Sequence, residues 1–351
     1  MTLLVTGGAG FVMSVLARHW LDANPRGRAV ILDAAPLDAA ATRYFGPVAE
    51  RLSIVVGDVA EPQSWRGALA PHHVTHVVHG ATITPISRGT AREARREPEA
   101  NDPGRIIDVN VMGTVALLDW ARTVSGLKRF VYVSSGAVYK HHGPDRPGEP
   151  LPEDGYVMPR RLYGISKLAS ELITERYGDL FELSTTSVRL SSVYGTMDRP
   201  TASRNMRHVP NTIAHLAVSG ARRVRVNTVD GVGDYVHAED VARAIVALLR
   251  LERVNHSTYN VAAGQTTRLA QLVEWAAEKY PGFHAEITSP EEADIVQDPT
   301  RTDGMWGAYD VSRIRAETGW APRPPREALH AYMDWIAAEG DLGRTAPQGG
   351  S

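Results

Sequence analysis

LLVTGGAGFV, residues 3–12, is the stretch that decides the fold. It reads as a short apolar strand, a glycine-rich turn and the start of a helix that ends near Asn24 and Pro25. A second apolar run, 28–32, stops at Asp33. Glycine lets such a turn bend tightly and approach a pyrophosphate, whose charge then lies at the helix N-terminus. The pattern predicts a βαβ unit that binds a dinucleotide through Gly7, Gly10, Phe11 and Val12.

The acidic end of the second strand predicts which dinucleotide binds. The Asp33 carboxylate would accept hydrogen bonds from the adenosine ribose and repel a 2′-phosphate, and no arginine follows it in residues 34–36. NAD is therefore expected rather than NADP. The third glycine that is typical of this turn would fall at Met13, so the helix must stand further off or hold this side chain aside.

The composition excludes several classes of protein and site. The 351 residues carry 38 Lys and Arg against 40 Asp and Glu, a net charge of -2, so we expect no nucleic-acid or membrane partner. There is no cysteine, which removes disulfides and thiolate chemistry. The first strand begins almost at Met1, and no run of about 18 apolar residues follows, so a cytoplasmic protein is expected.

Strands and helices alternate through the first half of the chain. Apolar runs at 52–56, 74–78 and 129–133 read as strands, separated by helices such as the one expected at 63–70. This alternation predicts an α/β fold, a doubly wound parallel sheet of the Rossmann type, with ligands at the carboxyl ends of its strands. The candidate cofactor contacts at those ends, and on the following helix, are Asp58, Val59, His79, Gly80, Ala81, Asn110, Ser134 and Leu190.

The pattern becomes less regular after residue 190. We expect a Rossmann domain over 1–190, to which 229–262 return, and a smaller C-terminal α/β substrate-binding cap from 191–228 and 263–340, followed by a disordered tail at 341–351. Helices are expected at 105–125, 161–177, 209–218, 268–280 and 325–336. The polar segment 82–104 is interpreted as a solvated loop or short surface helix, with a lid over the substrate as the alternative.

Tyr163 and Lys167 lie four residues apart, one turn along the same helix face. A tyrosine loses its proton near pH 10, and a nearby lysine together with a positive nicotinamide would lower this pKa. Tyr163 could then take the proton of a secondary alcohol, while Lys167 also reaches the nicotinamide ribose. Ser135 would hold the same substrate oxygen. The expected substrate contacts are Thr82, Ser135, Gly136, Ser191, Ser192 and Arg199.

Taken singly, these patterns also fit an ordinary turn and an exposed Tyr–Lys pair, but together and in this order they point to one family. The chain resembles the extended short-chain dehydrogenase/reductases, which include NAD-dependent nucleotide-sugar epimerases and dehydratases. The likeness covers essentially residues 1–340 and rests on 6–12, Asp33, 57–59, 110–114, 133–139, 163–167, 234–237 and 240–241. It implies a catalytic Ser135, Tyr163 and Lys167, a role in carbohydrate metabolism, and a homodimer built from the helices at 105–125 and 161–177.

Departures from the family pattern bear on the reaction. Sugar 4,6-dehydratases carry an Asp-Glu pair directly after the Ser or Thr that ends their fifth strand, which corresponds to Ser135 here. This chain has Gly136 and Ala137 in place of the pair, so a dehydratase is not expected. Epimerases tend to have an Asn where this chain has Ser192, and an arginine for the substrate pyrophosphate where it has Gly233. Arg199, Arg204, Arg207 or Arg222 could replace that arginine.

The sequence therefore favours an NAD-dependent oxidoreductase that acts on a secondary alcohol of a sugar-like or other small hydroxy compound lacking a nucleotide. The alternative is a nucleotide-sugar 4-epimerase that uses the same Ser, Tyr and Lys, and a non-catalytic NAD-sensing protein is a third possibility. No metal site is expected, because strand alternation sends His76 and His79 to opposite faces of the sheet.

Overall fold

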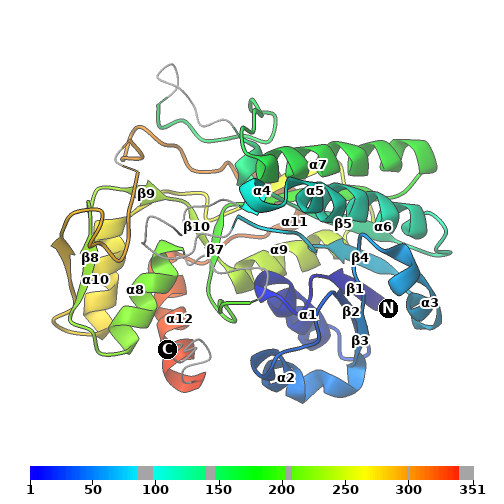
Figure 1. Cartoon of the computed structure of the whole chain (residues 1–351), viewed down its shortest axis with the longest axis horizontal. Coiled ribbons are helices and arrows are strands. Elements are labelled where there is room, and N and C mark those ends of the chain that lie inside the picture. The colour runs from blue at the N-terminus through cyan, green and yellow to red at the C-terminus, as the bar shows by residue number, and fades with distance from the viewer. Residues whose placement is uncertain (86–97, 140–146, 202–207, 299, 340–351) are drawn as a thin grey trace.

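The computed structural model describes residues 1–85, 98–139, 147–201, 208–298 and 300–339 (Figure 1). Its centre is a seven-stranded sheet in the order β11-β6-β5-β4-β1-β2-β3, in which every pairing is parallel. The predicted Rossmann-type fold is thus confirmed. The strands are β1 (Thr2–Thr6), β2 (Arg28–Asp33), β3 (Leu52–Val56), β4 (His76–His79), β5 (Arg129–Ser135), β6 (Thr185–Leu190) and β11 (Thr258–Val261).

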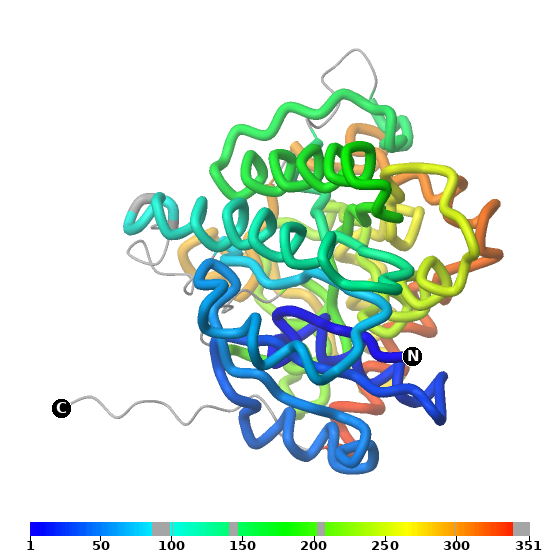
Figure 2. Tube along the Cα trace, turned by 90° about the vertical axis from the view of Figure 1, so that its right-hand side faces the viewer, coloured from blue at the N-terminus to red at the C-terminus, as the bar shows by residue number. Residues whose placement is uncertain are grey.

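Helices cover both faces of this sheet. Because side chains alternate along a strand, Leu3 and Val5 of β1 pack with one apolar cluster and Leu4 packs with another. The first cluster includes α1 (Phe11–Ala23), α9 (Ala238–Arg250) and α11 (Ser312–Thr318), and the second includes α3 (Arg66–Leu69) and α6 (Gly113–Ala121). Figure 2 shows α6 and α7 (Leu162–Phe181) side by side on the second face.

Two helices differ from their expected form. The helix expected at 63–70 is broken at Trp65, whose φ of -135° is not helical, into a turn at Pro62–Ser64 and α3, and a second turn follows at Ala70–His72. The helix expected at 105–125 consists of α5 (Pro103–Ile107), a π-helical turn at Asp108–Met112, and α6. Such π turns change which carbonyls are free to accept side-chain hydrogen bonds.

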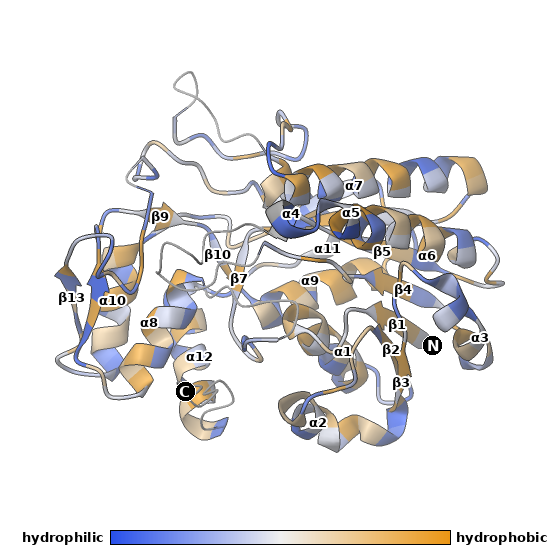
Figure 3. Ribbon diagram, viewed as in Figure 1, coloured by the Kyte–Doolittle hydropathy of each residue, from blue (hydrophilic) through white to orange (hydrophobic). Residues whose placement is uncertain are grey.

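A smaller lobe, which lies at the left of Figure 3, carries its own apolar core. The helices α8 (Val209–Val218), α10 (Leu269–Lys279) and α12 (Pro325–Glu339) pack beside the parallel pair β8 (Arg223–Val226) and β13 (His284–Ile287). Two short ladders join this lobe to the sheet: β7 (Ser192–Tyr194) with β10 (Tyr235–His237), and β9 (Val232–Gly233) with β12 (Thr267–Arg268).

Some short helices were not predicted from the sequence, and some predictions concern residues that the structure does not describe. The short helices α2 (Ala39–Phe45) and α11 were not predicted, whereas α4 (Pro98–Asn101) lies in the segment 82–104, where a loop or short surface helix was expected. Most of the expected loop or lid at 82–104, and the tail at 341–351, lie among residues that the structure does not describe, as do Arg204 and Arg207. Within the described ranges, no helix combines the length and apolarity that crossing a bilayer requires.

Candidate functional site

The glycine-rich turn between β1 and α1 lies directly against the end of β4. Gly7 has a φ of +72°, and a Cβ on it would lie 3.0 Å from the backbone of Ala81, so only glycine fits this position without strain. The Ala9 amide donates to Asp33 Oδ2 at 3.0 Å, which links the turn to the end of β2.

The N-terminus of α1 is open to an anion. Gly10 is the N-cap residue, no side chain caps the helix and its first turn contains no acid. Phe11 is buried and Val12 is half-buried, so the first turn is fixed by packing. The first-turn amides and the helix dipole at this end fit the pyrophosphate of a dinucleotide.

Met13 takes the place of the third glycine, and Gly80 makes room for it. A Cβ on Gly80 would lie 2.4 Å from Met13 Sδ, and Met13 is only 5% exposed. The helix α1 can therefore still pack closely against the sheet, because Gly80, directly after β4, has no side chain in the space that Met13 occupies. The two residues form a complementary pair.

This pairing predicts a coupling between positions 13 and 80. Gly80→Ala should lower the free energy of unfolding by about 1–3 kcal/mol through overpacking. Adding Met13→Ala should offset part of that loss, so thermal or denaturant unfolding should show the double variant to be less destabilised than the sum of the two single variants. Simple additivity would contradict the contact.

Two carboxylates mark the adenosine side of the expected cofactor site. Burial raises the pKa of Asp33, while the amides of Ala35, Ala9 and Ala34 oppose this by donating to the carboxylate. Asp58 forms an ion pair with Arg105 and accepts from the Ala60 amide at 2.9 Å. Both groups lie at carboxyl ends of strands, where the sequence analysis placed the ribose and adenine. Val59 is buried against Gly113.

His79 is a structural histidine. Its Nδ1 lies 2.6 Å from Thr6 Oγ1 and its Nε2 lies 3.0 Å from Thr114 Oγ1. Burial, and then the charge of Lys167, lower the pKa of His79 to about 3, so the ring is neutral. Its side chain points into the helix layer, which leaves only its backbone to pass beneath a cofactor. The next residues, Gly80 and Ala81, are held by hydrogen bonds to Thr6.

Asn110 locks the segment that follows β4. Its Oδ1 accepts from the Ile83 amide at 2.7 Å, and its Nδ2 donates to Ser166 Oγ at 3.0 Å. The π turn leaves its backbone carbonyl to accept from Ser170 Oγ at 2.7 Å. Asn110 therefore ties the β4 loop to α7. Nearby, the buried Thr82 Oγ1 has no hydrogen-bond partner among the described residues.

Lys167 lies beneath the first turn of α7. Its Nζ donates to the Val133 carbonyl at 2.8 Å and lies 5.9 Å from the centroid of the Tyr163 ring. Burial lowers the pKa of Lys167 to about 7. A Cβ on Gly164 would lie 2.6 Å from the Ala137 carbonyl oxygen, so α7 begins against the turn that follows β5. The fold thus brings the Tyr–Lys pair to the end of β5.

Ser135 ends β5 at this same place. Its Oγ accepts from the Ala137 amide at 3.2 Å and caps a short turn at Gly136–Val138. Ser135 pairs in register with Leu190 of β6. The neighbouring Ser134 Oγ is buried and has no partner in the described part of the chain.

Asp234 connects the expected substrate contacts of the following loops. It accepts from Ser191 Oγ at 3.0 Å and from the amides of Ala263 and Tyr309 at 2.8 and 3.2 Å, while the Ser192 amide donates to its carbonyl. Burial raises the pKa of Asp234 to about 6 in spite of these hydrogen bonds. This carboxylate therefore fixes loops and is not itself exposed.

Arg199, one of the expected substrate contacts, packs against the glycine-rich turn between β1 and α1 and against Asp38. Its guanidinium forms an ion pair with Asp38 at 2.9 Å and donates to the carbonyls of Ala9 and Met197 at 3.1 and 3.2 Å. These partners already engage its donors, and Arg222 is exposed on the cap. Neither residue is placed to replace the arginine that is absent at Gly233.

Two further residues, which sequence reasoning missed, lie beside positions where this chain departs from the family pattern: Tyr309 beside Gly136, and Arg301 beside Val232 and Gly233. Tyr309 Oη lies 1.9 Å from the position that a Cβ on Gly136 would take. The Arg301 guanidinium stacks on the Trp306 ring at 4.4 Å, has a buried Nε without a partner in the described residues, and makes no ion pair with a carboxylate in those ranges. Both follow the region where the alternation fades. The available signal was Gly136, a glycine directly after the expected catalytic serine.

Comparisons with known proteins agree with this geometry. The sequence profile of the NAD dependent epimerase/dehydratase family matches residues 3–262. The chain is 28% identical over 341 residues to a dTDP-glucose 4,6-dehydratase of Streptomyces antibioticus, covering 95% of this chain and 92% of the relative. It is 27% identical over 357 residues to a UDP-glucose 4-epimerase of Erwinia amylovora, covering 95% and 97%.

A solved structure shows the same fold over the whole length. The UDP-glucose 4-epimerase of Thermotoga maritima, crystallised with UDP-glucose, superposes with a TM-score of 0.77 at 21% identity and covers 97% of this chain and 99% of its own. With the glycine turn, Asp33 and the open helix end all suited to a dinucleotide, the cofactor is NAD. The chain belongs to the NAD dependent epimerase/dehydratase family.

Proposed function

We propose that this enzyme reversibly oxidises a secondary alcohol of a nucleotide sugar, with 4-epimerisation as its net reaction. The observation that carries the proposal is the buried Lys167 beneath Tyr163, at the turn that follows Ser135. A non-catalytic NAD sensor would have no need to bury an ammonium group in this position at the cost of its desolvation. We therefore favour an enzyme over a sensor.

The roles of the three residues follow from their chemistry. Tyr163 takes the alcohol proton and returns it, and a charged Lys167 favours the phenolate that does so. Ser135 donates to the substrate oxygen and holds it near Tyr163. When bound, NAD supplies the hydride acceptor and donor. Gly7, Gly10 and Asp33 would hold its pyrophosphate and ribose.

A dehydration reaction is not proposed, although 4,6-dehydratases are among the relatives. Removing water needs a proton donor and a proton acceptor beside the sugar. Gly136 and Ala137 offer neither, and a side chain at position 136 would collide with Tyr309. The nearby Glu153 is only 7% exposed and accepts from the Asn260 amide at 2.8 Å, so it is directed away from this space.

The nucleotide is proposed because of Arg301. Gly233 cannot be replaced by a long side chain, because a Cβ there would lie 2.4 Å from Cζ of the Tyr235 ring. Arg301 provides a cation on the same side, and its free donors suit a phosphate. Relatives that act on UDP-, dTDP- and GDP-sugars add support. We therefore favour a nucleotide sugar over the nucleotide-free substrate that Gly233 alone suggested.

The test is incubation with UDP-glucose, dTDP-glucose and GDP-mannose. We expect inversion at one sugar carbon without accumulation of the NADH absorbance band, whereas lasting NADH would show net oxidation and a 4-keto-6-deoxy product would show a dehydratase.

Arg301→Met should weaken binding of the nucleotide by about 10–100-fold in calorimetric titration, because a charge-assisted contact is lost. Arg222→Met, at an exposed cap position, is the matched control. Unchanged binding in Arg301→Met would contradict this assignment.

We also propose that two copies pair through α7 and the helix beside it. Ile165 and Leu172 are seven residues apart on one face of α7 and are 44% and 56% exposed, and Met112 nearby is 51% exposed. Such apolar residues on one exposed helix face suit a helix-to-helix interface. Leu172→Glu should convert a dimer into a monomer in sedimentation analysis, whereas Arg222→Glu, at an exposed position of the cap, should not. A monomeric wild-type protein would contradict the pairing.

A further inference from the structure

The segment that precedes α11 places a tyrosine against the turn that follows Ser135. A Cβ on Gly136 would lie 1.9 Å from Tyr309 Oη and 2.5 Å from its Cζ. Since a carbon–carbon single bond is about 1.5 Å long, the hydroxyl lies within about 3.5 Å of the Gly136 Cα. The phenol of Tyr309 therefore fills the space of the side chain that Gly136 lacks.

Backbone contacts on both sides hold Tyr309 in this position. The Leu151 amide donates to the Ala308 carbonyl at 2.8 Å, and the Asp310 amide donates to the Leu151 carbonyl at 3.0 Å. Tyr309's own amide donates to Asp234 at 3.2 Å. Its ring meets the ring of Tyr139 edge-on, with centroids 5.7 Å apart. The hydroxyl is thus fixed before any substrate arrives.

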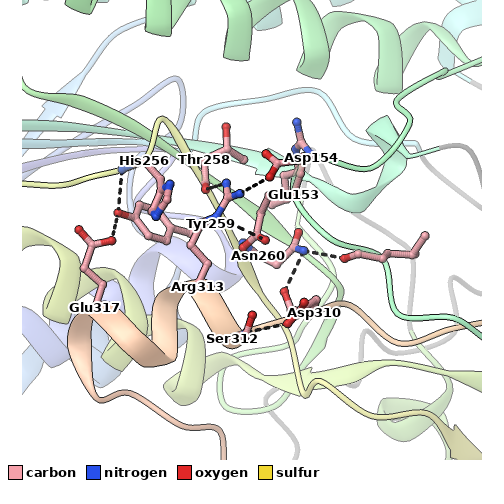
Figure 4. Close-up of polar contacts among 12 residues, drawn as sticks. Glu153, Asp154, His256, Thr258, Tyr259, Asn260, Asp310, Ser312, Arg313 and Glu317 are labelled. Carbon is pink, nitrogen blue, oxygen red and sulfur yellow. Dashed lines mark hydrogen bonds and ion pairs between the residues drawn. The ribbon is translucent and has the colours of Figure 1, made fainter.

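A polar network behind this segment adds to its rigidity, as Figure 4 shows around Asn260. Asn260 Nδ2 donates to the carbonyls of Asp310 and Leu151 at 3.0 and 2.9 Å, and its amide donates to Glu153 at 2.8 Å. Arg313 links Asp154 to the Thr258 carbonyl of β11. The segment that carries Tyr309 is therefore anchored to the central sheet.

The Tyr309 hydroxyl itself is left for a ligand. Tyr309 as a residue is 6% exposed, and no described residue hydrogen-bonds to its Oη. Burial, and then the negative charge of Asp234, raise the pKa of Tyr309, so its hydroxyl keeps its proton at neutral pH. A hydroxyl that has no hydrogen-bond partner among the described residues is available to donate to an acceptor on a bound molecule.

We propose that the Tyr309 hydroxyl contacts the sugar beside the reacting carbon and donates a hydrogen bond to one of its oxygens. This proposal rests on the proposed function and adds a residue to it. Where dehydratases of the family carry an acid after the strand-five Ser or Thr, this chain leaves a glycine and fills the space with a neutral donor from a distant segment. The donor selects a hydroxylated sugar, and as a neutral phenol it does not supply the carboxylate base that removing water needs.

The first test separates the sugar from the nucleotide. The NAD-loaded enzyme is titrated with UDP and with UDP-glucose in a calorimeter. Tyr309→Phe should weaken the binding of UDP-glucose by about tenfold and leave the affinity for UDP unchanged. A purely structural role would weaken both or neither. Tyr280→Phe, the same change at the end of α10, is the control. Equal affinity of wild type and Tyr309→Phe for UDP-glucose, or no binding by the wild type, would overturn the contact with the sugar.

The second test concerns the placement and does not depend on the substrate. Thermal unfolding should show that Gly136→Ala destabilises the wild-type protein, and that it does so much less in a Tyr309→Ala background, because the colliding phenol is gone. Equal losses in both backgrounds would overturn the placement. If the wild type binds UDP but not UDP-glucose and this coupling is present, the proposed substrate fails while the position of Tyr309 stands.

Discussion

Replacing Tyr163 by phenylalanine is expected to slow the oxidation of the sugar by about 10²–10⁴-fold. Phenylalanine keeps the ring, which lies 5.9 Å from Lys167 Nζ, and removes only the oxygen that accepts the proton. Affinity for NAD and the melting temperature should therefore stay close to those of the wild type. Mixing the NAD-loaded protein with the nucleotide sugar that the wild type converts, and following the NADH absorbance band through one turnover, measures the step.

The control is the same substitution elsewhere on α7. Tyr177 is half-buried and its hydroxyl lies 3.4 Å from Asp119, away from the turn after Ser135. Tyr177→Phe should leave the single-turnover rate unchanged. A Tyr163→Phe variant that oxidises its sugar as fast as the wild type would remove the phenol from the reaction.

Glu171→Ala is expected to destabilise the protein by about 3–5 kcal/mol, because it leaves an unpaired buried guanidinium. Glu171 and Arg189 are 3% and 5% exposed, and Arg189 Nε lies 3.1 Å from both carboxylate oxygens. Arg189 also donates to the Glu153 carbonyl at 2.8 Å and stacks on Tyr139 at 4.8 Å. The ion pair therefore joins α7 and β6 to the loop that leads to the substrate side.

Denaturant unfolding measures this loss directly. Glu175→Ala removes an exposed carboxylate one turn further along α7 and should change the free energy of unfolding by less than about 0.5 kcal/mol. If the two variants were equally stable, the buried ion pair would not contribute as described. The comparison also separates loss of helix propensity from loss of the pair, since both substitutions place alanine in the same helix.

The sequence was sufficient to predict most of the fold because its signals are local. The strands at β1, β2 and β3 and the helix α8 lie where apolar runs and helical periodicity placed them. The short ladder between β7 and β10 was not predicted, because its three-residue strands take their stability from neighbouring elements and not from their own sequence. The broken helix near α3 shows that a helical pattern can be interrupted at a single residue, here Trp65 with a φ of -135°.

The candidate site was predictable only where its residues are close to sequence motifs. Ser135, Tyr163 and Lys167 follow a spacing that can be read directly. Arg301 and Tyr309 reach the site through tertiary packing, more than 130 residues after Tyr163 along the chain. No periodicity marks them, because each acts as a single side chain from an irregular segment.

His79 illustrates the opposite case, in which position on a strand does not settle the direction of a side chain. It is the last residue of β4, at the carboxyl end of the sheet where ligands are expected, yet its ring lies between Thr6 and Thr114. Strand alternation and the two hydroxyl partners turn it into the helix layer. The side chain of a residue at the carboxyl end of a strand can therefore pack in the core while its backbone faces the expected ligand.

The most direct measurement is the fate of deuterium placed on the reacting carbon of UDP-, dTDP- and GDP-sugars. We predict that mass spectrometry will find the label on the nicotinamide of the protein-bound cofactor during turnover, and back on the same carbon of a product with inverted configuration. Loss of the label to water, or its failure to reach the cofactor with any of these sugars, would contradict hydride transfer at the site formed by Ser135, Tyr163 and Lys167.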